Sequence, residues 1–182
     1  MSAIEAAFNE YQQFTKRTAV YPQVLALPYL MLGLGDEAGE VLEATVSLLK
    51  GNSSHKRELL AAEVGDVLWY LAQVLLQLDR SLGDAWHASL GLESQFEASF
   101  AGAAMEVSIV ASKMQGRYKK HIRDDGVLDN STLLALAARL LRALTALCQS
   151  CGTNLPLVAH ANRLKLEDRL KRDVIKGEGD HR

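Results

Sequence analysis

Two long stretches with apolar residues at helical spacing, joined by a short polar turn, constrain the fold of this chain more than any other feature. The first stretch ends near Lys50 and the second starts near Ser54, with the turn KGNSSHK between them. Apolar residues recur three and four positions apart in both, which is the pattern of amphipathic helices. Because so short a turn favours an antiparallel helix pair, we expect a helical hairpin at the centre of the fold.

Each helix of this expected hairpin carries two acidic residues three positions apart. Glu37 and Glu40 stand in GDEAGEVLEA, and Glu63 and Asp66 stand in LLAAEVGDVLWYL. Residues three apart share one face of a helix, so each pair directs two carboxylates the same way. The hairpin could therefore bring the two acidic pairs face to face.

Four clustered carboxylates need either protons or cations. Two unit charges about 4 Å apart repel by roughly 4 kcal/mol at an effective dielectric near 20. Oxygen ligands without His or Cys favour a hard ion, so we expect Mg²⁺ first, with Mn²⁺ as a second candidate. The alternative is that the acids line a solvated helix face, and their spacing alone does not decide between the two.

Composition points to an all-α protein without a nucleic-acid or membrane partner. The chain has 182 residues, only 3 Pro and 6% aromatic residues, and its length suits one domain or two small ones. A formal net charge of -2 gives no electrostatic footprint for nucleic acid or an anionic membrane. The apolar runs over 24–34 and 67–78 are interrupted and too short for a bilayer, and the first residues do not resemble a signal peptide. We expect a cytoplasmic protein.

Helix-starting and helix-stopping residues divide the chain into further elements. We expect Asn130 or Ser131 to cap one helix, and Asn154 with Pro156 to start the last one. The expected helices cover residues 2–16, 28–50, 54–80, 96–121, 130–151 and 155–171, with a short helix and a bend over 81–96.

The second half of the chain resembles the first. Leu and Ala positions recur, and His160 aligns with His87. We expect two repeated hairpin modules, over 1–95 and 96–182, forming one compact unit as an internal pseudo-dimer. Only one acid of the second set is kept, so the second module could not hold the same metal site. The aligned pairs are Ala103 with Glu37, Glu106 with Glu40, Leu136 with Glu63 and Arg139 with Asp66.

The acidic motifs and the end of the chain resemble the MazG-like nucleoside triphosphate pyrophosphohydrolases of the all-alpha NTP pyrophosphatase group. That family often carries GEAGE followed by ELGDVLWY, and the segments here read DEAGE and EVGDVLWY. It also often closes with an Asn, a Lys-Leu pair, an Arg and a GxGDxR tail, matched here by Asn162, Lys165, Leu166, Arg169 and GEGDHR. The resemblance covers roughly the chain from residue 29 onward.

This resemblance implies Mg²⁺-dependent hydrolysis of a (deoxy)nucleoside triphosphate to the monophosphate and pyrophosphate. It implies that Glu37, Glu40, Glu63 and Asp66 are catalytic metal ligands, although one glutamate could act as a base instead. Near the end of the chain the implied substrate-binding residues are Asn162, Lys165, Arg169, Asp180 and Arg182. Lys119, Lys120 and Arg123, in the charged segment GRYKKHIRDDG, could also contact the phosphates, although the segment could instead be a solvated run of charges.

Departures from the family pattern leave other functions open. Usual members are single modules that assemble as dimers or tetramers, whereas two modules in one chain could act as a monomer or still form a homodimer. A catalytically weak helical nucleotide-binding or protein-interaction module is the alternative function. A diiron carboxylate bundle is a third, but its Glu-x-x-His spacing occurs here only in the glycine-containing tail, at Glu178 and His181.

Overall fold

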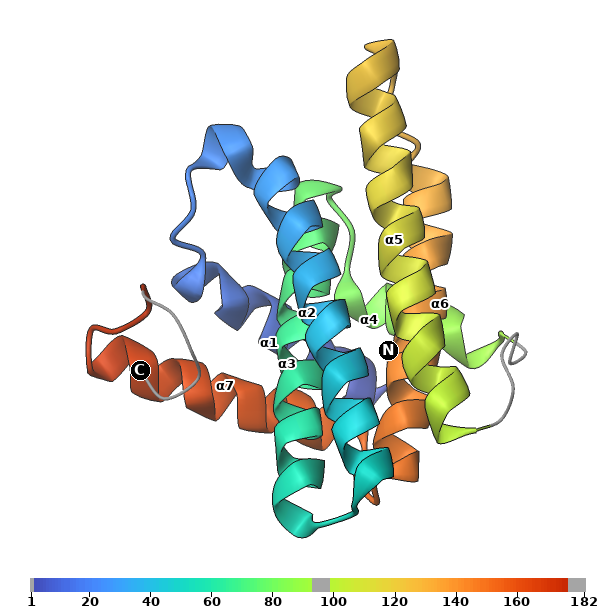
Figure 1. Ribbon diagram of the computed structural model, residues 1–182. Helices are drawn as coiled ribbons and strands as arrows, with labels where there is room; N and C mark the ends of the chain where they lie inside the picture. Colours follow the sequence, from blue (N-terminus) through green and yellow to red (C-terminus); the bar gives the residue numbers. More distant parts are fainter. Residues whose placement is uncertain (1, 93–98, 177–182) are drawn as a thin grey trace.

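The structure is a computed structural model that describes residues 2–92 and 99–176. Within these residues it is all-helical, with seven α-helices, two short 3-10 helices and no strand. This confirms the all-α class that composition and periodicity predict. Figure 1 shows the helices arranged around a central pair.

The central pair is the expected antiparallel hairpin of α2 (Ala26–Lys50) and α3 (Ser54–Gln77). Ser53 caps α3, because its hydroxyl accepts a hydrogen bond from the Lys56 amide at 3.2 Å. That bond satisfies one of the N–H groups that a helix start leaves without a helical partner. The short turn thus folds back as the sequence predicts.

Two ends of these helices differ from the prediction. Helix α2 begins at Ala26 rather than Pro28, because a proline in the first helical turn gives up no helical hydrogen bond. Helix α3 ends at Gln77 rather than near Arg80. The reason is Asp79, whose left-handed backbone, with φ of 54°, cannot continue a right-handed helix.

A second antiparallel hairpin, formed by α5 (Phe100–Asp124) and α6 (Asn130–Ser150), packs against α2 (Figure 1). The cap of α6 is Asp129, not Asn130 or Ser131, because its carboxylate accepts the backbone N–H three residues later at 3.0 Å. The prediction that α5 starts near residue 96 falls outside the described residues. Helix α6 ends at Ser150, one residue before the predicted end at residue 151.

The other three helices cover the two hairpins: α1 (Ala3–Thr15), α4 (Leu82–Leu90) and α7 (Leu155–Lys171). Helix α7 packs against α3 and α1, and α4 packs against α1 and α6. As predicted, Asn154 caps α7 and Pro156 lies in its first turn. The 3-10 segments between α1 and α2 cover Lys16–Thr18 and Gln23–Leu25.

The buried apolar side chains form one continuous core between these helices. Each fully buried Leu contributes about 1.5–3 kcal/mol relative to an exposed one. This packing fixes α3 between α2 and α7, which is the arrangement that positions the acids. The largest fully buried side chains include Phe8, Leu30, Leu34, Leu68, Leu71 and Met114.

Helices α3 and α6 are each long and apolar enough to cross a membrane. Both contain an 18-residue window with a mean hydropathy of 1.5, although 56% of each window is buried inside the protein. Core helices of water-soluble domains share these properties. The expectation that the apolar runs over 24–34 and 67–78 are too short for a bilayer therefore stays a prediction, as does the cytoplasmic location.

Candidate metal centre and adjoining pocket

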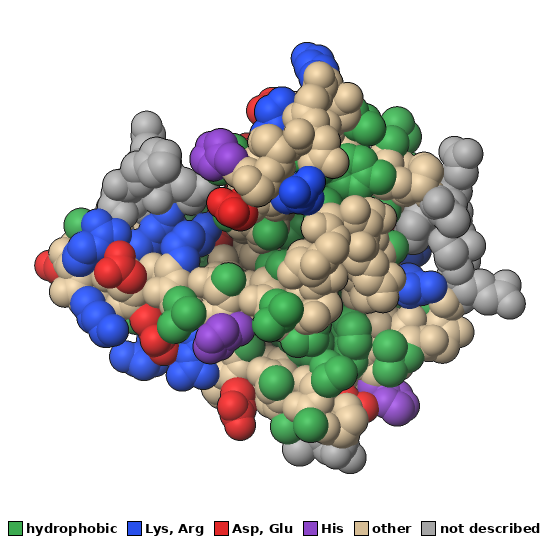
Figure 2. Space-filling view, turned by 90° about the horizontal axis from the view of Figure 1, so that it is seen from below, with side chains coloured by type: hydrophobic (Ala, Val, Ile, Leu, Met, Phe, Trp, Pro, Cys, Tyr) green, Lys and Arg blue, Asp and Glu red, His purple; other side chains and the backbone are tan. Residues whose placement is uncertain are grey.

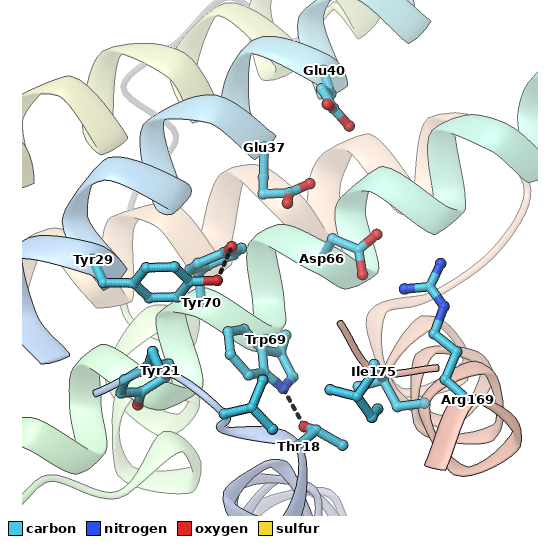
Figure 3. A pocket seen from close by; sticks show the side chains of 12 residues that line it. Thr18, Tyr21, Tyr29, Glu37, Glu40, Asp66, Trp69, Tyr70, Arg169 and Ile175 are labelled. Carbon is cyan, nitrogen blue, oxygen red and sulfur yellow. Dashed lines mark hydrogen bonds between the residues drawn. The ribbon is translucent and has the colours of Figure 1, made fainter. Parts of the chain in front are cut away.

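Three carboxylates converge in the middle of the central hairpin. Glu37 on α2 faces Glu63 and Asp66 on α3, and one oxygen of each lies within 4.8 Å of the other two. The convergence follows from the local sequence, because Glu63 and Asp66 are one turn apart on α3 and the hairpin sets them opposite Glu37. Figure 3 shows the carboxylates of Glu37 and Asp66 directed into the same space.

Glu40 stands one turn further along α2, outside this converging set. Its side chain is exposed, and it lines the same pocket as Glu37 and Asp66. Figure 3 shows it beyond Glu37, at the edge of the site. The structure thus divides the predicted group of four into three converging acids and one acid at the rim.

Burial, together with the charges of the nearby acids, raises the pKa of Glu37 to about 8. Burial is the largest cause, the negative charges of Asp66, Glu40 and Glu63 add to it, and the positive charge of Lys165 opposes it. A divalent cation would offset the charges that oppose ionisation of Glu37. Three carboxylate groups without His or Cys form a donor set that fits Mg²⁺ or Mn²⁺.

Helix α7 brings two hydrogen-bond donors to Asp66. Asn162 Nδ2 donates to Oδ1 at 2.8 Å, and Lys165 Nζ donates to Oδ2 at 2.5 Å. Gly65 allows this close approach, because a Cβ at that position would lie 3.0 Å from Asn162 Cβ and Nδ2. Two residues that the resemblance assigns to substrate binding therefore contact one of the three converging acids in this structure.

A pocket of about 220 Å³ opens beside the acids. Glu37, Glu40 and Asp66 form one side of it, and the buried guanidinium-bearing side chain of Arg169 lies on the α7 side (Figure 3). The pocket therefore combines negative groups, a positive group and an apolar wall. That wall contains four aromatic residues, namely Tyr21, Tyr29, Trp69 and Tyr70.

The aromatic wall is held together by its own contacts. The rings of Tyr21 and Tyr29 stack with centroids 5.0 Å apart, and Trp69 meets Tyr70 edge-on at 4.9 Å. The indole N–H of Trp69 donates to Thr18 Oγ1 at 2.8 Å (Figure 3). Trp69 is both largely buried and pocket-lining.

The three tyrosines of this wall were missed by sequence reasoning. Tyr21 lies in the connector between α1 and α2, where no helical period marks it. Tyr29 lies at the start of α2, outside the acidic motif. Tyr70 directly follows Trp69 in the second motif, and this adjacency is the one signal that could have identified it.

The cations at the end of α5 are not among the described residues that line this pocket. Lys119 lines a separate apolar groove between α2 and α5, Lys120 is exposed, and Arg123 pairs with Asp124. Lys and Arg side chains gather at the edge of the molecule where the end of α7 lies (Figures 1 and 2). The two predicted residues outside the described residues are Asp180 and Arg182.

An ion pair lies in the second hairpin at two of the aligned positions. Glu106 on α5 accepts a hydrogen bond from Arg139 Nε on α6, and the Glu106 side chain is only 4% exposed. Ala103 and Leu136, at the two other aligned positions, carry no charge. A guanidinium therefore balances the one acid that the second hairpin keeps there.

The chain is similar to the Gene 37 protein of Mycobacterium phage L5. The two are 37% identical over 79 residues, which cover 38% of this chain and 69% of the phage protein. No protein-family model and no solved structure matches the chain. The name of the phage protein states no activity, so a functional conclusion has to come from the site.

Proposed function

We propose that this chain, which belongs to the family of the Gene 37 protein of Mycobacterium phage L5, is a Mg²⁺-dependent hydrolase of (deoxy)nucleoside triphosphates. Its products are the monophosphate and pyrophosphate. The observation that carries the proposal is the convergence of Glu37, Glu63 and Asp66, with one oxygen of each within 4.8 Å of the other two. The adjoining pocket supports it by adding a cationic side chain and an aromatic wall.

Each side of the pocket matches one part of such a substrate. Glu37, Glu63 and Asp66 would hold Mg²⁺, which when bound offsets phosphate charge and lowers the pKa of a coordinated water. Arg169 would bind phosphate oxygens through its guanidinium. The aromatic wall offers ring faces on which a nucleobase can stack.

The position of Glu40 at the rim suits a different role from that of the converging acids. It lies outside the set within 4.8 Å and is exposed to solvent. We therefore assign Glu40 as the base, which accepts a proton from the attacking water at a carboxylate oxygen. Asn162 and Lys165 would keep Asp66 in place while the substrate binds.

The finer fold proposal is a bundle of the all-alpha NTP pyrophosphatase type with an internal pseudo-dimer. The two packed hairpins and the Glu106–Arg139 pair at aligned positions support it. In this arrangement the first module, 1–95, supplies the acids. The second module, 96–182, supplies Asn162 and Lys165 and holds no metal of its own.

Pyrophosphate release tests the reaction directly. Wild-type protein is offered a panel of dNTPs and NTPs with Mg²⁺, with Mn²⁺ and with a chelator. We expect release that needs the metal and that Glu63→Gln abolishes, because the metal loses a charged ligand. The matched control is Glu43→Gln, which changes an exposed glutamate on α2 that is not among the residues lining the pocket.

Two results would contradict the proposal. Pyrophosphate release without a metal would show that the acids do not act by holding a metal ion. Unchanged turnover in Glu63→Gln would show that Glu63 is not a metal ligand. Nucleotide binding without turnover in the folded protein would instead favour the alternative, a helical nucleotide-binding or protein-interaction module. Cytoplasmic location and the choice between monomer and homodimer remain proposals beside this one.

A further inference from the structure

A buried hydrogen-bond chain connects the N-terminal helix to the metal-site carboxylate. The hydroxyl of Tyr11 on α1 donates to Asn162 Oδ1 at 2.8 Å, and Asn162 Nδ2 donates to Asp66 Oδ1 at 2.8 Å. Tyr11 is 3% exposed and Asn162 is 4% exposed. Because both side chains are shielded, water competes little for either bond.

This chain fixes which way the Asn162 amide points. A primary amide presents an acceptor oxygen on one side and a donor nitrogen on the other. The Tyr11 hydroxyl occupies the oxygen, so the nitrogen faces Asp66. Burial and the charge of Asp66 raise the pKa of Tyr11 well above its ordinary value, so its O–H remains a donor.

The carboxylate of Asp66 is thereby oriented before any cation binds. Its Oδ1 is held by Asn162 and its Oδ2 by Lys165, both on α7. Gly65 lets Asn162 lie close to α3, because a Cβ on residue 65 would stand 3.0 Å from Asn162 Cβ. The orientation of Asp66 therefore depends on how α1 holds Asn162.

We propose that Tyr11 is a positioning residue that orients the metal ligand Asp66 through Asn162. This inference rests on the proposed function, since the metal role of Asp66 belongs to it. Outer hydrogen-bond partners of metal ligands typically change metal affinity by about 10- to 100-fold. Two hydrogen bonds separate Tyr11 from Asp66, whereas one separates Asn162 from it. Loss of the Tyr11 hydroxyl should therefore weaken metal binding less than loss of the Asn162 amide.

Three variants separate positioning from a general loss of packing. Tyr11→Phe removes one hydroxyl and keeps the ring, and Asn162→Ala removes the bond to Asp66 directly. Thr15→Val is the matched control, because it removes another buried hydroxyl from α1. That hydroxyl accepts a hydrogen bond from Gln73 at 2.6 Å, not from Asn162.

Two measurements test how firmly the Asn162 amide is held and how strongly the protein binds metal. In metal-free protein, NMR follows hydrogen exchange of the Asn162 side-chain amide, and calorimetry then measures Mn²⁺ affinity. We expect Tyr11→Phe to speed that exchange and to weaken Mn²⁺ binding about 3- to 10-fold, with Asn162→Ala weakening it about 10- to 100-fold. Thr15→Val should leave both quantities at their wild-type values.

The outcomes separate this inference from the proposed hydrolysis. Wild-type exchange and affinity in Tyr11→Phe, or equal changes in Thr15→Val, would overturn the positioning role even if the enzyme releases pyrophosphate. If Tyr11→Phe and Asn162→Ala change amide exchange and Mn²⁺ affinity as expected, but the wild-type protein hydrolyses no nucleotide, the positioning role of Tyr11 would be supported and the proposed reaction would be overturned.

Discussion

At the scale of single residues, Glu37 shows how the hairpin creates chemistry that an isolated helix lacks. Burial and three nearby carboxylates raise the pKa of its carboxyl to about 8 from an ordinary value of 4.5. In metal-free protein the folded state therefore binds a proton on Glu37 more tightly than the unfolded state does. The free energy of unfolding falls as pH rises between these two values.

We predict that Glu37→Gln removes most of this pH dependence. Metal-free wild-type protein should lose a few kcal/mol of stability between pH 5 and pH 8, since a tenfold difference in proton affinity between the folded and unfolded states corresponds to about 1.4 kcal/mol before solvent screening. The variant, which cannot ionise, should be more stable than wild type at pH 8. Urea unfolding in the presence of chelator measures both, and a wild-type slope in Glu37→Gln would refute the assignment.

A second residue-scale prediction concerns proton release on metal binding. At pH 7 Glu37 is mostly protonated in metal-free protein and has to ionise to act as a ligand, so Mn²⁺ binding should release close to one proton. Calorimetry in buffers of different ionisation enthalpy counts that proton. Glu37→Gln should release fewer protons, and equal release from both proteins would mean that Glu37 does not titrate with the metal.

At the scale of elements, the Glu106–Arg139 pair is expected to join α5 to α6. Removing either partner leaves the other charge poorly compensated. We expect Glu106→Leu or Arg139→Met alone to cost about 2–3 kcal/mol, less than a fully buried pair, because the Arg139 side chain is 24% exposed. The double variant should recover most of that loss. Additive losses in a double-mutant cycle would show that the pair does not stabilise the hairpin.

Helical elements could be predicted from this sequence more fully than their caps. Apolar periodicity identified both hairpins, and Asn154 was predicted as a cap because few other candidates stand near it. The α6 cap was predicted wrongly because the loop before it offers several side chains that can accept a backbone N–H. In the structure Asp129 is the cap because its carboxylate accepts the Thr132 backbone N–H, and the Ser131 and Thr132 hydroxyls also donate to that carboxylate.

The candidate site could be predicted only where local spacing determines it. The converging acids follow from helical geometry within one hairpin. The contacts of Asn162 and Lys165 with Asp66 depend on α7 packing across α3, which local sequence does not encode. The tyrosine wall depends on the path of the connector before α2, and the Tyr11 contact on the docking of α1.

At the scale of the whole molecule, both halves of one chain contribute to the site. Glu37 and Asp66 come from the first half, and Lys165 and Arg169 come from the second. We predict that hydrolysis per chain does not change on dilution, because one chain supplies both the acids and the cationic side chains of the proposed site. Assays from micromolar to nanomolar protein, paired with sedimentation, check this. Specific activity that falls as an oligomer dissociates would contradict it.

Arg139, which pairs with Glu106, also affects how the stability of the protein depends on the concentration of divalent ions. A charge carried on a side chain cannot diffuse away, so the second hairpin keeps its balance whatever the supply of divalent ions. The acids of the first hairpin are balanced in part by Lys165, which donates to Asp66 Oδ2 at 2.5 Å, and under the proposed function the remaining positive charge comes from a divalent ion. If Glu37, Glu63 and Asp66 hold Mg²⁺ as proposed, magnesium starvation would destabilise the first hairpin and leave the stability of the second hairpin unchanged.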